Sequence, residues 1–298
     1  MELYNKQNGR DWGVNLDQRA ELDGASLLYG RHGKGEPVLV IHGVLIADAV
    51  IPPLQLHPEI FEHYEFIGYY RAGYHGSTCD EKQVSIETCA EHVKQLLDYL
   101  ELEKVHLVSY SFGGLVAMQV MLSYPERVHT SVMLEPYLPR ESQTAIEDNT
   151  RAFTEAFALY EQGHLLAAAQ SYQAGICGDR FLASVDLTCS RDVWDKVTAA
   201  TNTVFTVDMP AYMNWGFRPS QADDAIISKK PDMPVLAVMG ADSESVVAGF
   251  RETQAFLLDW LPQAERCGIP YATHGLQMMN PSAVAKSMLH FLQKHPLT

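Results

Sequence analysis

Five short runs of consecutive apolar residues limit the possible folds of this 298-residue chain more than any other feature. A strand that is apolar at successive positions has both faces buried, which is typical of a parallel sheet covered by helices. Helical patterns separate the runs; the pattern over residues 86–100 follows Ser85, which is suited to cap a helix. Strands that alternate with helices predict βαβ units in a doubly wound, mostly parallel sheet. The runs are Val38–Ile41, Phe66–Ile67, Val105–Val108, Val132–Leu134 and Val235–Met239.

Three further patterns extend this α/β core. The dipeptide Asp23-Gly24 is suited to a tight turn and predicts a hairpin over residues 18–31. The segment Leu115–Leu122 is apolar nearly all round, which is typical of a helix buried against a sheet. Residues 284–292 carry the apolar stripe of an amphipathic last helix. The core therefore extends over nearly the whole chain, with one interruption.

The interruption lies between about Tyr137 and Pro231. Helical patterns occur there, for example over residues 152–169, but no convincing buried strand precedes Val235. We therefore expect a helical cap inserted after the sixth strand of the core. The resulting division has a first core segment at residues 1–136, a cap at 137–231 and a second core segment at 232–298.

Composition and charge exclude several classes of function. The formal net charge is −15 and no basic stripe occurs, so nucleic acid and anionic membrane surfaces would be repelled. No run of roughly 18 apolar residues is present, which predicts no transmembrane helix. The first residues, MELYNKQNGRDWG, are neither basic nor apolar, so we expect no secretory signal. A role in binding nucleic acid is therefore not expected, and the net charge says little about a small-molecule substrate, because it is not the charge of the site.

The cysteines are five, an odd number, and include no C-x-x-C pair. This pattern argues against a disulfide framework and against a zinc site, and favours reduced thiols in a cytoplasmic protein. No cluster of His, Asp and Glu has the spacing of metal ligands, so we expect neither a metal nor a cofactor. The oligomeric state leaves no sign in the sequence, and a homodimer stays open.

A serine lies where a buried strand runs directly into a buried helix, in Val105-His-Leu-Val-Ser-Tyr-Ser111-Phe-Gly-Gly114. A sharp strand-to-helix turn with small residues two positions before and after exposes a serine oxygen for attack, and Ser109 and Gly113 are small. The helix N-terminus offers backbone N–H groups to an oxyanion. The alternative is that Ser111 only caps the helix. The strand-before, helix-after context favours a nucleophile.

The chain resembles the α/β-hydrolase superfamily over most of its length. His42-Gly43 is similar to the oxyanion turn of that superfamily, and the resemblance implies an oxyanion hole formed by the amides of Val44 and Phe112. The segment Tyr70-Arg-Ala-Gly-Tyr-His-Gly-Ser77 is similar to its Arg-x-Gly-Tyr-Gly-x-Ser loop. The chain departs from the pattern in having Ser109 and His75 where the superfamily usually has Gly.

The general base is predicted at His274. A serine hydroxyl needs a base to take its proton, and histidine has a suitable pKa. In this fold the histidine comes last along the chain. His274 lies in Pro270-Tyr-Ala-Thr-His274, similar to the Pro-x-Ala-x-His setting of the superfamily, just before the last helix.

Two carboxylates compete for the role of the acid. Most relatives carry it three residues after a Gly that follows the later strand; here Ser243 occupies that position and Asp242 falls one residue short. Glu135, which follows the preceding strand and comes before Pro136, resembles a subset that includes zearalenone-lactone hydrolases and some haloalkane dehalogenases. We favour Glu135 and keep Asp242 as the alternative; as plain structure, Glu135 would be a loop carboxylate and Asp242 a helix cap.

The walls of the substrate pocket are predicted only loosely. Trp194, Trp215 and Tyr212 fall within the cap, where they either line an apolar pocket or form the small core of the cap itself. Met278 follows the predicted base closely and would supply adaptable apolar surface.

These residues together predict a serine hydrolase that cleaves an ester or lactone of an apolar small molecule through an acyl-enzyme. Carbon–carbon bond hydrolysis and cofactor-free haloperoxidase or lyase chemistry use the same scaffold and stay as alternatives. A small-molecule receptor with little turnover is the alternative of another class.

Overall fold

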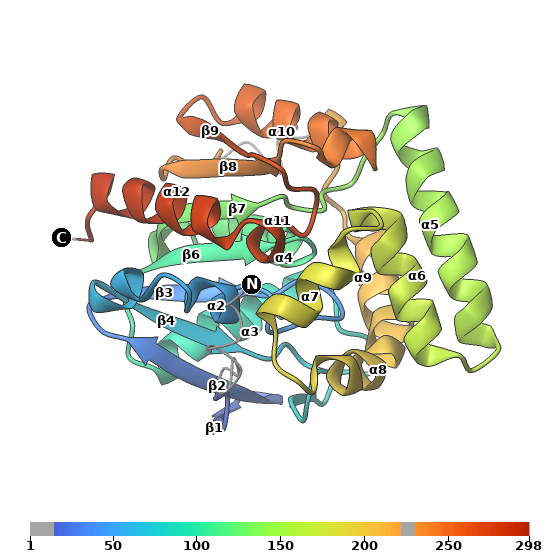
Figure 1. The fold of residues 1–298 in the computed structure, drawn as a ribbon. Helices are drawn as coiled ribbons and strands as arrows, with labels where there is room; N and C mark the ends of the chain where they lie inside the picture. Colours follow the sequence, from blue (N-terminus) through green and yellow to red (C-terminus); the bar gives the residue numbers. More distant parts are fainter. Residues whose placement is uncertain (1–14, 222–229, 298) are drawn as a thin grey trace, which may run out of the picture.

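The computed structural model describes residues 15–221 and 230–297, which form a mostly parallel sheet with helices on both faces (Figure 1). The strand order is β1-β2-β4-β3-β6-β7-β8-β9, with the short β5 paired to β2. The pairs that involve β2 are antiparallel, and all pairs from β4 to β9 are parallel. The strands are β1 Gln18–Leu22, β2 Ala25–Gly33, β3 Glu36–Ile41, β4 Tyr64–Tyr69, β5 Thr78–Cys79, β6 Val105–Tyr110, β7 Val128–Leu134, β8 Val235–Gly240 and β9 Ala264–Ile269.

All five apolar runs lie in strands, and the central strands β6 and β8 are buried at every position. This burial on both faces explains why apolar residues predominate in these strands, with His106 and Ser109 of β6 as buried polar exceptions. The hairpin expected around Asp23-Gly24 is formed by β1 and β2, and Gly24 has a positive φ of 73° that suits a tight turn.

The core helices pack in two groups on opposite faces of the sheet: α2 with α12, and α3 with α4 (Figure 1). The oxygen of Ser85 accepts a hydrogen bond from the amide of Thr88, which confirms the expected N-cap of α3. The core helices are α2 Ile51–Leu54, α3 Ile86–Tyr99, α4 Gly113–Ser123, α10 Gly249–Trp260, α11 Leu276–Met279 and α12 Pro281–Lys294, with the short 3₁₀ turns η1 Pro58–Glu62, η2 Pro125–Arg127 and η5 Ser243–Ser245.

Between β7 and β8 the chain forms a layer of helices at one end of the sheet (Figure 1). This layer of helices, which we call the cap, follows β7, which is the sixth strand if the two-residue β5 is left out. The helical pattern over 152–169 is divided between α5 and α6 by a turn at Gly163, whose φ is 80°. Residues 222–229 of the expected cap segment lie outside the described residues. The elements are α5 Gln143–Glu161, α6 Leu165–Cys177, α7 Phe181–Thr188, α8 Val193–Thr203, the π-helical turn η3 Val204–Asp208, α9 Met209–Asn214 and η4 Pro219–Gln221.

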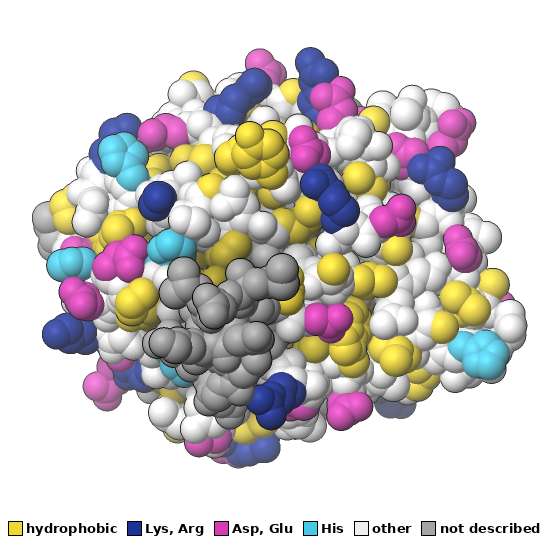
Figure 2. Space-filling view, viewed as in Figure 1, with side chains coloured by type: hydrophobic (Ala, Val, Ile, Leu, Met, Phe, Trp, Pro, Cys, Tyr) yellow, Lys and Arg dark blue, Asp and Glu magenta, His cyan; other side chains and the backbone are white. Residues whose placement is uncertain are grey.

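The cap covers the end of the sheet at which the parallel strands finish. The segments that follow β3, β6, β7 and β9 therefore meet beneath it, as is general for sites in open α/β sheets. On the face shown in Figure 2, basic and acidic side chains are interspersed. Within the described ranges no helix is long and apolar enough to cross a membrane. The segment assessed for a secretory signal lies outside the described residues.

Candidate active site

Ser111 occupies a strained turn between β6 and α4. Its φ is +53°, a left-handed conformation that a serine adopts only at an energetic cost of order 1–3 kcal/mol. The turn is fixed by its neighbours: the Ser111 amide donates to the Leu134 carbonyl at 3.1 Å, and the Ser111 carbonyl accepts from the Tyr137 amide at 3.0 Å. A Cβ on Gly113 would lie 2.2 Å from the Ile41 carbonyl oxygen, so only glycine fits there. The expected sharp turn is present.

Ser111, His274 and Glu135 form a continuous chain of hydrogen bonds. The Ser111 hydroxyl lies 2.8 Å from Nε2 of His274, and Nδ1 of His274 lies 2.8 Å from Oε2 of Glu135. The other oxygen of Glu135 accepts the Gly240 amide at 2.9 Å. With Nδ1–H donated to the carboxylate, Nε2 is left free to accept the serine proton.

The His274 ring is buried and clamped. It is 3% exposed, stacks on Phe250 with ring centres 4.3 Å apart and lies 5.1 Å from the ring of Tyr110. Burial lowers the pKa of His274, and the neighbouring Glu135 carboxylate opposes this only in part. The imidazole is therefore neutral at neutral pH and can take a proton.

Asp242, the alternative acid, lies at the surface. Its side chain is 43% exposed and pairs with Arg180 at 3.2 Å, and its amide is held by the Ala272 carbonyl. The one-residue shift in the turn after β8 turns its carboxylate away from His274. Glu135 reaches His274 because its own backbone adopts a φ of +45° directly after β7. The structure thus brings Glu135, and not Asp242, to His274.

Val44 and Phe112, which carry the two candidate oxyanion amides, lie close to Ser111. Phe112 is the next residue, at the N-terminus of α4, and the loop after β3 passes so close that a Cβ on Gly43 would lie 3.1 Å from Cβ of Ser111. That loop turns at Leu45, whose φ is +64°, with the Ile46 amide donating to the Val44 carbonyl at 2.8 Å. Within the described part of the chain, neither candidate amide donates to a protein acceptor. Both can donate to a bound oxyanion.

A narrow cavity opens beside Ser111 and His274, with about 360 Å³ of empty space, part of it at the open mouth. Helix α6 of the cap forms one wall, and Met278 is among the residues that line the cavity. The Oε1 atom of Gln173 is buried and has no hydrogen-bond partner among the described residues. The other residues that line the cavity are Val44, Ile46, Tyr110, Tyr172, Gln173, Ile176, Cys177 and Phe181.

The three cap aromatics considered for the pocket lie elsewhere. Trp194 donates its indole N–H to Asp186, on α7. Trp215 is buried against Phe217 and donates to Gln119 of the core; Tyr212 packs against Tyr137. These side chains make contacts within the cap or between the cap and the core. The sequence of a helix does not show whether an aromatic side chain packs inside the cap or lines a pocket. The side chains of α6 that line the cavity share one face of that helix: Tyr172, Gln173, Ile176 and Cys177.

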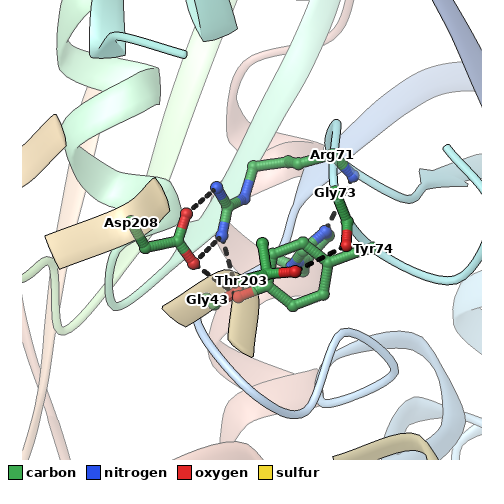
Figure 3. Close-up of polar contacts among 7 residues, drawn as sticks. Gly43, Arg71, Gly73, Tyr74, Thr203 and Asp208 are labelled. Atoms are coloured by element: carbon green, nitrogen blue, oxygen red, sulfur yellow. Dashed lines mark hydrogen bonds and ion pairs between the residues drawn. The ribbon is translucent and has the colours of Figure 1, made fainter. Parts of the chain in front are cut away.

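Sequence reasoning also missed a buried ion pair between Arg71 and Asp208 (Figure 3). Two guanidinium nitrogens of Arg71 donate to the two Asp208 oxygens at 2.7 and 3.0 Å, and Nη2 also donates to the Gly43 carbonyl at 3.2 Å. The hydroxyl of Tyr74 donates to Asp208 at 2.5 Å. Burial by itself would lower the pKa of Arg71, but the Asp208 carboxylate beside it raises the pKa overall. The sequence motif at residues 70–77 includes Arg71, but its partner Asp208 lies 137 positions further along the chain.

No group of three or more His, Cys, Asp or Glu side chains in the described ranges is placed to hold a metal ion. The machinery in view consists of a hydroxyl, an imidazole, a carboxylate and backbone amides. Such a set suits proton transfer and nucleophilic attack on a carbonyl.

Residues 36–281 match the family model described as the alpha/beta hydrolase fold. A non-heme chloroperoxidase of Kitasatospora aureofaciens is 26% identical over 91% of this chain and 98% of its own length. An uncharacterized hydrolase of Bacillus subtilis is 31% identical over 37% of each chain. The chain thus spans little more than a third of the length of that relative.

Among solved structures, an alpha/beta hydrolase from Sphaerobacter thermophilus superposes with a TM-score of 0.70 at 20% identity, covering 92% of this chain and 100% of its own. The enol-lactonase from Burkholderia xenovorans superposes with a TM-score of 0.71 at 17% identity, covering 93% and 100%. These likenesses concern the fold. The family match over residues 36–281 shows that the chain belongs to the α/β-hydrolase family.

Proposed function

We propose that this enzyme hydrolyses an ester or lactone of a small, largely apolar molecule through an acyl-enzyme on Ser111. The single observation that carries the proposal is the buried chain from Ser111 to His274 to Glu135, with 2.8 Å at each link. A hydroxyl with a neutral imidazole at hydrogen-bond distance, itself oriented by a carboxylate, is the arrangement that activates a serine.

In the proposed reaction the Ser111 oxygen attacks the substrate carbonyl carbon while its proton passes to Nε2 of His274. The tetrahedral intermediate collapses, the bond to the alcohol oxygen breaks, and His274 returns the proton to that oxygen. Water, activated by the same imidazole, then cleaves the acyl-enzyme and restores the serine. Glu135 orients the imidazole and offsets its charge while it is protonated. In a lactone the released alcohol stays attached to the acyl group.

The amides of Val44 and Phe112 would hold the oxyanion of each tetrahedral intermediate. A donor aimed at this oxygen contributes about 3–4 kcal/mol to the transition state in comparable sites. Their lack of protein acceptors within the described residues supports this role, because nothing in the chain competes with the oxyanion.

The proposed substrate class comes from the cavity. Most of its lining side chains are apolar or aromatic, so an ester or lactone with an apolar body fits it. The carboxamide of Gln173 provides one polar contact in that wall. The enol-lactonase shares the fold and is consistent with this choice. No metal or cofactor enters the proposed mechanism.

A second candidate is cofactor-free haloperoxidase chemistry, which is favoured by the chloroperoxidase that matches 91% of the chain. Hydrogen peroxide would replace water in attacking the acyl-enzyme, which releases a peracid and restores the serine. The two functions share Ser111 and differ in the acceptor, so adding peroxide and a short carboxylic acid distinguishes them.

The test is turnover of p-nitrophenyl esters of increasing chain length and of aliphatic lactones by the wild type, Ser111→Ala and His274→Ala. We expect hydrolysis by the wild type and a loss of at least about 10³-fold in both variants. Turnover that survives in Ser111→Ala would exclude the serine mechanism. Tight binding of a lactone without turnover would instead indicate a receptor.

A further inference from the structure

We propose that Arg71 and Asp208 are positioning residues that fix the oxyanion-binding loop and make its geometry depend on the docked cap. The proposal rests on the proposed function, because it assigns a purpose to the amide of Val44. It concerns the cluster of Gly43, Arg71, Gly73, Tyr74, Thr203 and Asp208 labelled in Figure 3.

The Gly43 carbonyl and the Val44 amide belong to the same peptide, and none of the described peptide bonds is cis, so the two groups point in opposite directions. The Gly43 oxygen accepts from Nη2 of Arg71 at 3.2 Å and from Nδ1 of His42 at 2.7 Å. The N–H of Val44 is thereby directed away from Arg71, toward the side on which Val44 lines the cavity with Ser111.

The His42 ring has one defined role in this arrangement. Its Nε2 accepts the backbone amide of Arg71 at 3.0 Å, so the proton is on Nδ1 and is donated to the Gly43 oxygen. Burial and the nearby Arg71 charge lower the pKa of His42 well below its usual range, which keeps the ring neutral. Arg71 therefore acts on Gly43 both through its side chain and, by way of His42, through its backbone.

Arg71 also contacts the second candidate oxyanion donor. Its guanidinium carbon lies 4.5 Å from the centre of the Phe112 ring and 4.9 Å from that of Tyr74. A planar guanidinium can stack on rings while its edge donates to a carboxylate and a carbonyl, which a lysine ammonium cannot do. Arg71 thus contacts the peptide group that carries the Val44 amide and the side chain of Phe112.

The anion that holds Arg71 belongs to the cap. Asp208 is the last residue of η3, whereas Gly43 and Arg71 follow core strands β3 and β4. Arg71 and Asp208 are 2% and 1% exposed, and a buried charge that loses its partner is strongly unfavourable. Thr203, also of the cap, donates to the Gly73 carbonyl at 2.6 Å in the same loop. Moving the cap away would leave Arg71 unpaired and release Gly43.

If Arg71 and Asp208 position the Val44 amide, their loss should lower kcat, whereas loss of a merely structural ion pair should not. Misplacing the Val44 amide weakens binding of the tetrahedral state and leaves ground-state binding nearly unchanged. Arg71→Lys keeps a charge for Asp208 but loses the forked contact, and Asp208→Asn removes the anion. We expect kcat to fall roughly 10- to 100-fold in each, with KM changed less than about threefold.

The experiment measures kcat and KM on a p-nitrophenyl ester, together with Ki for phenylboronic acid, which forms a tetrahedral adduct with an activated serine. Across wild type, Arg71→Lys, Asp208→Asn and the milder Tyr74→Phe, log Ki should rise in step with the fall in log kcat/KM. The matched control is Lys196→Met, which removes another ion pair between the cap and the core, Lys196 to Asp48 at 2.9 Å, and should leave kcat and Ki unchanged.

A variant series that melts at lower temperature but keeps wild-type kcat and boronate Ki would overturn the inference and leave the proposed function standing. If the wild type hydrolyses neither esters nor lactones, the proposed function fails. Hydrogen exchange of residues 42–46 then decides the positioning claim: faster exchange in Arg71→Lys than in Lys196→Met supports it, and equal exchange refutes it.

Discussion

The two candidate acids can be separated by one pair of isosteric substitutions, Glu135→Gln and Asp242→Asn. The amide of Gly240 donates to Oε1 of Glu135 at 2.9 Å, so in Glu135→Gln the carboxamide oxygen stays on Gly240 and the NH₂ faces His274. Nδ1 of His274 must then accept, which moves the ring proton to Nε2. Nε2 can no longer take the Ser111 proton.

The expected magnitude follows from that tautomer change. Replacing the acid of a Ser-His-acid triad by its amide, with the geometry kept, lowers kcat about 10⁴-fold. We therefore expect a loss of roughly 10³- to 10⁴-fold in Glu135→Gln. Asp242→Asn breaks only a surface pair with Arg180, which contributes little to stability, and kcat/KM should stay within about twofold.

The assay is kcat/KM on a p-nitrophenyl ester across pH 5–9 for both variants, with melting temperatures to show that each is folded. Wild-type activity in Glu135→Gln would show that Glu135 is not the acid. Loss of activity in Asp242→Asn instead would assign that role to Asp242.

Three further predictions follow from named contacts. Because burial lowers the pKa of His274, its neutral form is favoured in the folded state, so kcat/KM should stay level above pH 6.5 and decline only at more acidic pH. The free energy of unfolding linked to the neutral His274 is likewise lost as pH falls through the folded pKa. An acid limb centred above pH 7 in the pH–rate profile would contradict this prediction. Gly113→Ala should lower the free energy of unfolding, measured by denaturant titration, by about 1–3 kcal/mol, because the new Cβ meets the Ile41 carbonyl. Gly216→Ala, whose Cβ would have nothing within 4 Å, should change it little. Equal effects of the two substitutions would disprove the packing argument. Gln173→Leu should leave the melting temperature unchanged or raise it, since it removes a buried unpartnered oxygen, while lowering kcat/KM for hydroxylated esters relative to alkyl esters; a uniform loss on both would show that Gln173 does not contact substrate.

The buried strands and the nucleophile Ser111 could be predicted from short segments of the sequence. Burial on both faces favours strands made mostly of apolar residues, so β6 and β8 could be predicted without knowledge of the strands that pair with them. Ser111 was readable because the strand, the small neighbours and the helix that make its turn are contiguous. His274 and Glu135 were predicted from the resemblance to the α/β-hydrolase superfamily, with Asp242 left as an alternative acid.

Contacts between distant segments were not readable. Arg71 and Asp208 lie 137 positions apart, and nothing in either segment marks the other as its partner. The positive φ angles at Leu45 and Glu135 are imposed by packing, since neither residue type favours that conformation. The wall of the cavity depends on which face of α6 turns toward the core, and a helix that packs on both the cap and the core has apolar residues on more than one face.

The central claim is that Ser111 is an activated nucleophile, and covalent labelling tests it most directly. Wild type, Ser111→Ala and His274→Ala would be treated with a fluorophosphonate probe and analysed by intact mass and peptide mapping. The account predicts one adduct per wild-type chain, located on Ser111, with no adduct in Ser111→Ala and much slower labelling in His274→Ala. A folded wild type that stays unlabelled, or an adduct on another residue, would contradict it.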